Sequence, residues 1–129
     1  AGQLHAYLDG LGVEIMANSD NVLRGGLTSK NIDVAELMNL VTCEPLDDPT
    51  LRPAAGGHYI TPAPEFDLQR LDAGATLAVN GPAIVLSVDD SVKVDGRSLA
   101  SAEAVWVGAS DEPVEVAGRA FIARVGCQS

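Results

Sequence analysis

The chain has 129 residues, 47% of them apolar, which suits one compact domain or a small domain joined to part of another. Its formal net charge is −10 and its 8 basic side chains are scattered, so we expect no nucleic-acid partner and no anionic membrane partner. No apolar run is long enough to span a membrane, and the first residues lack the basic and apolar regions of a signal peptide.

Residues 1–30 are predicted to begin with a β-hairpin. Apolar segments at 4–8 and 12–16 flank Asp9-Gly10, a dipeptide typical of two-residue hairpin turns. Because side chains alternate along a strand, one face of this hairpin would be apolar and buried, and the other would place His5 opposite Glu14. Opposed side chains lie about 5 Å apart at Cβ, close enough to share a proton or a metal ion.

Residues 31–43 are predicted to form a short helix. Asp33 is a good N-cap, and Glu36 stands three residues later in the capping-box position. Apolar residues then recur at helical spacing and predict one buried stripe. The stripe consists of Val34, Leu37, Met38 and Val41.

The segment between Pro45 and Pro64 holds several prolines and a Gly-Gly pair, so it is predicted to connect without regular structure, with His58 as a solvated loop residue. From about Phe66 onward, short runs rich in Val and Ile alternate with turn signals. These runs lie at 76–79, 83–88, 91–94, 104–109, 114–116 and 121–125. They predict a small antiparallel barrel or sandwich, with Trp106 in its core or at its rim.

Two groups of residues could carry chemistry. Neutral imidazole is the commonest metal ligand and a natural general base, although His5 could equally be a structural histidine. A zinc site needs at least three protein ligands, and only Glu14 and Gln3 lie near His5 in the sequence. The segment from Arg24 to Lys30 has two glycines and two hydroxyls before a helix and could hold an anion. Its spacing is not that of a P-loop, and composition alone favours a flexible turn with a surface lysine.

Taken together, residues 5–30 (HAYLDGLGVEIMANSDNVLRGGLTSK) closely resemble the signature region of type I mannose-6-phosphate isomerases. The segments GPAIVLSVDDSVKVDG and VWVGASDEPVEV resemble the C-terminal β domain of that family. The resemblance implies a mainly β, cupin-like antiparallel barrel or sandwich of jelly-roll type with one short helix. It divides the chain into trailing strands of the catalytic domain at 1–30, a helix and connector at 31–64, and a β domain at 65–129. One departure is Ser29, where the family usually has proline.

The resemblance also implies roles for five residues. His5 matches the last zinc ligand, Arg24 the catalytic arginine, and Glu14 a residue that either transfers a proton or orients its neighbours. Tyr7 and Lys30 match residues that line the substrate pocket. The implied reaction is the zinc-dependent interconversion of mannose 6-phosphate and fructose 6-phosphate by proton transfer between C1 and C2.

The family's other zinc ligands come from an N-terminal half that this sequence does not contain. Ala1 therefore reads as a start in mid-sequence, and we expect the isolated chain to be inactive. The expected partners are a phosphosugar substrate and the N-terminal half of a cytoplasmic enzyme. The alternatives are a sugar-phosphate-binding β domain without catalysis and a structural β domain that binds neither ligand nor metal.

Overall fold

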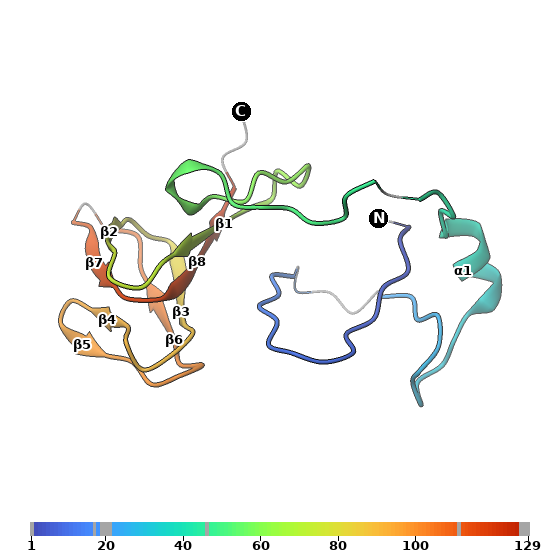
Figure 1. Cartoon of the computed structure of the whole chain (residues 1–129), viewed down its shortest axis with the longest axis horizontal. Helices are drawn as coiled ribbons and strands as arrows, with labels where there is room; N and C mark the ends of the chain where they lie inside the picture. Colours follow the sequence, from blue (N-terminus) through green and yellow to red (C-terminus); the bar gives the residue numbers. More distant parts are fainter. Residues whose placement is uncertain (1, 17, 19–21, 46, 111, 127–129) are drawn as a thin grey trace. The chain divides into compact units, whose positions relative to one another are not determined.

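The computed structural model describes residues 2–16, 18, 22–45, 47–110 and 112–126. The chain divides into two compact units, Ala1–Pro49 and Thr50–Ser129, which are described separately (Figure 1). The boundary falls inside the predicted connector, and the division into three segments stays a prediction. Within the described ranges, no helix is long and apolar enough to cross a membrane.

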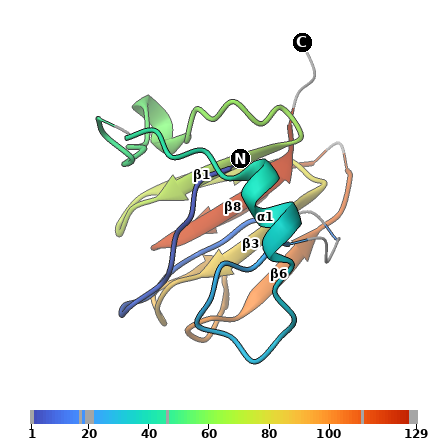
Figure 2. The same ribbon diagram turned by 90° about the vertical axis from the view of Figure 1, so that its right-hand side faces the viewer.

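The second unit is built from two four-stranded antiparallel sheets. One sheet has the order β1 (Phe66–Leu71), β8 (Ala120–Val125), β3 (Ala83–Ser87), β6 (Ala104–Val107). The other has the order β2 (Thr76–Val79), β7 (Val114–Ala117), β4 (Lys93–Val94), β5 (Arg97–Ser98). Figure 2 shows the first sheet with β8 lying between β1 and β3.

Late strands therefore return beside early ones in both sheets, which is the Greek-key connectivity of an eight-stranded jelly roll. The predicted mainly β, cupin-like fold of jelly-roll type with one short helix is confirmed.

The core of this unit lies between the sheets and follows from strand alternation. In β3 the inward residues Ala83, Val85 and Ser87 are buried, while Ile84 between them is exposed. Val79, Val116 and Ile122 have no exposed surface. The β4–β5 hairpin turns at Asp95-Gly96, where both residues have positive φ (47° and 77°), as a tight two-residue turn requires.

A polar cluster attaches the connector to β1 of this unit. Asp67 pairs directly with Arg124 across the β1–β8 ladder, and its carboxylate lies 3.3 Å from the Arg124 guanidinium and 2.9 Å from His58 Nδ1. Gln69 accepts a hydrogen bond from the same guanidinium at 2.9 Å and donates one to the carbonyl of Gly56, in the 3₁₀ turn η1 (Ala55–Gly57), at 2.8 Å. His58 was predicted to be a solvated loop residue. This prediction is wrong, because the His58 side chain pairs with Asp67 and its backbone forms a β-bridge with Gln69.

Of the two predicted positions of Trp106, core or rim, the structure contradicts the core. Its place in β6 puts it on the outer face of the β1-β8-β3-β6 sheet, where it is 65% exposed. Its neighbours Val105 and Val107 are the residues of β6 that face inward.

The first unit contains the helix α1 (Val34–Leu40). Asp33 caps it as predicted, with its carboxylate accepting a hydrogen bond from the Glu36 amide at 3.0 Å. The helix is shorter than the predicted 31–43 range, and its stripe is not buried: Val34 and Met38 are exposed and Leu37 is half-buried. A single helix of two turns has too few neighbours in this unit to cover an apolar stripe.

The predicted N-terminal strands are not formed. Residues 2–16 bend at Asp9-Gly10 but contain no strand, and the expected buried face is open to solvent, with Leu8 91% and Leu11 83% exposed. A two-stranded hairpin is marginal on its own, and no third strand of this unit pairs with it among the described residues. Residues 17 and 19–21 of the signature region lie outside the described residues.

Candidate functional site

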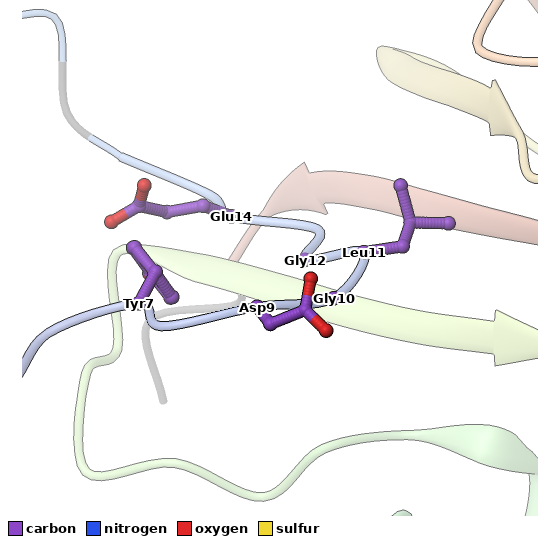
Figure 3. A pocket seen from close by; sticks show the side chains of 6 residues that line it. All are labelled: Tyr7, Asp9, Gly10, Leu11, Gly12 and Glu14. Atoms are coloured by element: carbon purple, nitrogen blue, oxygen red, sulfur yellow. The ribbon is translucent and has the colours of Figure 1, made fainter.

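The bend at Asp9-Gly10 encloses a small open pocket of about 390 Å³. Tyr7 and Asp9 line it from one arm of the bend, Glu14 from the other, and Gly10, Leu11 and Gly12 close its end. Figure 3 shows Tyr7 and Glu14 on the two arms, away from Leu11 at the tip. The structure thus brings together the tyrosine and the glutamate that the sequence selects as site residues.

His5 lies just outside this pocket. Its Nδ1 is 3.3 Å from the carbonyl of Gln3, and its ring meets that of Tyr7 edge to face with the centroids 6.2 Å apart. His5 and Glu14 line different pockets, so the predicted cross-strand pair of imidazole and carboxylate is not formed. The reason is the missing ladder, since that pairing depends on strand register.

A second pocket of about 370 Å³ joins the His5 segment to the glycine loop. Leu4, His5 and Ala6 line one side, and Gly25, Gly26 and Leu27 line the other. A Cβ at position 25 would lie 2.9 Å from Leu4 Cδ2, which is the end of a flexible, exposed side chain that can move aside.

The two basic residues of the site lie at either end of that loop. Arg24 is half-buried, and its guanidinium donates a hydrogen bond to the carbonyl of Val22 at 3.2 Å. Lys30 is exposed, and its backbone amide donates a hydrogen bond to the hydroxyl oxygen of Thr28 at 3.1 Å, which forms a local turn in the loop before the helix. Arg24 and Lys30 thus lie on either side of Gly25 and Gly26, in a chain whose net charge is −10.

The end of helix α1 is hydrogen-bonded to the segment that contains His5. The amide of Thr42 donates to the carbonyl of Gly2 at 2.8 Å and ties the end of α1 to the His5 segment. An apolar groove of about 440 Å³ separates them. Its apolar lining comprises Leu4, Val22, Leu23, Leu37, Leu40 and Val41.

The described residues of this chain do not form a zinc site by themselves. Among the described residues, no three His, Cys, Asp or Glu side chains lie close enough together to hold a metal ion. His5 offers an exposed imidazole, and a protein zinc site uses at least three such ligands.

Asp9 is a residue of this pocket that sequence reasoning did not select. The sequence indicates the first residue of a turn at this position, and in the structure Asp9 lines the same pocket as Tyr7 and Glu14. Its spacing of two residues from Tyr7 was the available signal, because alternation places both on the same side of an extended segment.

The chain is similar to known isomerases over most of its length. No family model matches the chain. It is 38% identical over 133 residues to mannose-6-phosphate isomerase of Escherichia coli, covering 94% of this chain and 34% of that protein. It is 36% identical over 118 residues to mannose-6-phosphate isomerase 1 of Arabidopsis thaliana, covering 84% of this chain and 27% of that protein. The chain thus spans about a third of the length of the relatives it matches.

Solved structures give the same result. The apo crystal structure of mannose 6-phosphate isomerase from Salmonella typhimurium superimposes with a TM-score of 0.67 and 29% identity over 87% of this chain and 32% of that one. The structure of the same enzyme bound to substrate and a zinc atom gives a TM-score of 0.64. In sequence and in fold, this chain matches the C-terminal part of the mannose-6-phosphate isomerases.

Proposed function

We propose that this chain forms the C-terminal part of a zinc-dependent isomerase that interconverts mannose 6-phosphate and fructose 6-phosphate. The observation that carries the proposal is the match over 94% of the chain to a mannose-6-phosphate isomerase. A cytoplasmic location stays a prediction.

The reaction moves a proton from C2 of the aldose to C1 of the ketose and shifts the carbonyl from C1 to C2. Negative charge develops on the substrate oxygens in between, as an enediolate. Arg24 stabilises this charge, because a guanidinium is always protonated and donates several fixed hydrogen bonds. Lys30 offers an exposed ammonium to the phosphate group, and Tyr7 offers a hydroxyl that can donate or accept.

Glu14 has two possible roles in the proposal. Its carboxylate faces the same pocket as Tyr7 and could move the proton between C1 and C2, or could orient the substrate hydroxyls. The pH dependence of a Glu14→Gln variant separates these roles, because only a proton carrier adds a titration step to kcat.

His5 supplies one imidazole ligand to zinc in this proposal, and the remaining ligands come from the part of the relatives that this chain does not match. When bound, zinc polarises substrate oxygens. The isolated chain should then neither bind zinc tightly nor turn over substrate. Stoichiometric tight zinc binding in calorimetry of the isolated chain would contradict this.

The test is a chimaera in which this chain replaces the matching third of the Escherichia coli isomerase. We expect zinc-dependent conversion of mannose 6-phosphate to fructose 6-phosphate. Arg24→Ala should lower kcat by about 100-fold or more, as expected for loss of an electrostatic stabiliser of the transition state. Arg52→Ala, which removes an exposed arginine outside the signature region, should leave it unchanged. A folded, zinc-loaded chimaera without activity, or full activity in Arg24→Ala, would overturn the proposal.

The two alternatives predict different results for the isolated chain. A sugar-phosphate-binding domain would bind mannose 6-phosphate without zinc and would lose this affinity in Arg24→Ala and Lys30→Ala. A structural domain would bind neither the sugar nor the metal.

A further inference from the structure

The outer face of the β1-β8-β3-β6 sheet is mainly apolar, with Arg70 of β1 as an exception. The strand registers place Leu68, Ala123, Ile84 and Trp106 side by side in one row. A neighbouring row contains Phe121, Leu86 and Ala104, opposite Arg70 of β1. The four strands lie in this order in Figure 2.

The other sheet is different. Its outward residues include Thr76 of β2, Glu115 of β7 and Lys93 of β4, while inward neighbours such as Val116 and Val94 are buried. This is the alternation expected for an antiparallel sheet with one face in water. In β3, β6 and β8 both faces are mainly apolar, a pattern typical of strands that are covered on both sides.

Tyr59, from the same unit, covers part of the apolar face. Tyr59 stacks on Phe121 with the ring centroids 6.4 Å apart, and its amide donates to the carbonyl of Leu68. Elsewhere on this face Leu68, Leu86 and Ala123 are half-buried, whereas Trp106 is 65% and Val125 72% exposed. Contiguous apolar surface with an exposed tryptophan marks an interaction site.

We propose that this face docks against the remainder of the isomerase polypeptide. The inference rests on the proposed function. The rest of the polypeptide is the favoured partner, because the part of each relative outside the matched region is about twice as long as the matched region. A partner large enough to cover this face is therefore present within one chain. A second copy of this chain is disfavoured, because each copy carries a net charge of −10 and would repel the other.

Cysteine accessibility tests the proposal with two matched variants. Ala104→Cys places a small thiol at an exposed position of the apolar face, and Ala78→Cys places one at an exposed position of the other sheet. Each is made in the isolated chain and in the Escherichia coli chimaera, and iodoacetamide labelling is followed by mass spectrometry of the peptide. We expect labelling at position 104 to be at least about tenfold slower in the chimaera than in the isolated chain, with labelling at position 78 alike in both.

The outcomes separate this proposal from the proposed function. Fast labelling at position 104 in an active chimaera overturns the docking surface and leaves the isomerase assignment standing. Slow labelling at position 104 in an inactive chimaera supports the surface and counts against the assignment. Slow labelling at position 104 in the isolated chain overturns the proposal. If the protection rises with protein concentration, a second copy covers the face; if it does not, another part of the same chain covers it.

Discussion

Asp67 lies at the centre of the polar cluster on β1. Replacing it with asparagine tests how much that cluster stabilises the jelly roll. The substitution keeps the size and one acceptor oxygen of the side chain but removes its charge. In the structure the carboxylate binds both His58 and Arg124, and its side chain is 30% exposed. A hydrogen bond to a charged group contributes about 1.5–3 kcal/mol to stability.

Two features reduce that figure here. Partial exposure screens both interactions, and Arg124 retains its 2.9 Å hydrogen bond to Gln69 in the variant. We therefore expect Asp67→Asn to lower the free energy of unfolding by about 1–2 kcal/mol. The loss should move the midpoint of urea unfolding by about 1 M. Trp106, the only tryptophan, lies on β6 and reports on this unit by fluorescence.

Asp72→Asn is the matched control. Asp72 also pairs with an arginine, since its carboxylate lies 3.0 Å from Arg70 Nε, but its side chain is 71% exposed. Solvent screens such a pair, so the urea midpoint should not move measurably. Equal shifts in the two variants, or none at Asp67, would refute the claim that partial burial gives the β1 cluster its strength.

Three further predictions concern single side chains. Ile122 has no exposed surface, so Ile122→Ala should cost about 2–5 kcal/mol of unfolding free energy and Ile122→Val about 1 kcal/mol, measured by urea unfolding. Asp33→Ala removes the N-cap bond to Glu36 and should reduce the helical circular dichroism signal, whereas Asp33→Asn should retain it. Hydrogen bonds from Ser91 lower the pKa of Asp89, so this carboxylate stabilises the fold above its ordinary pKa, and the contribution is lost as the pH falls through the lowered value. Ser91→Ala should raise the Asp89 pKa in an NMR titration, and an unchanged pKa would show that the side-chain bond does not matter.

The β-strands of the second unit were the most predictable part of the fold. Runs such as 76–79 and 83–88 have local signals, since Val and Ile fill a pleated surface and turn residues bound each run. Strand β1 is not among those runs because it contains Asp67, Gln69 and Arg70. Their polar groups are satisfied by partners such as Arg124, 57 residues away, which no local pattern reveals.

The outer face of the first sheet explains why Trp106 lies outside the core. From sequence, a tryptophan within a run of valines indicates a core position. In the structure the run alternates, so Val105 and Val107 take the core side and Trp106 takes the outer side. When a strand is apolar on both faces, its sequence does not indicate which face packs within its own domain and which packs against another part of the protein.

The site residues stay a prediction, but the predicted geometry of their hairpin is not formed, and hydrogen exchange tests the reason. The predicted strands 4–8 and 12–16 have the alternation and the turn of a hairpin, yet they form no ladder within the described part of this unit. If the missing element is a neighbouring strand, the amides of both segments should exchange freely in the isolated chain and become protected by about 100-fold or more in the chimaera, where such a strand is supplied. Protection would then bring His5 opposite Glu14, the pairing that strand register predicts. Free exchange in an active chimaera would show instead that the site works from the bent loop described here, with Tyr7 and Glu14 sharing one pocket and His5 outside it.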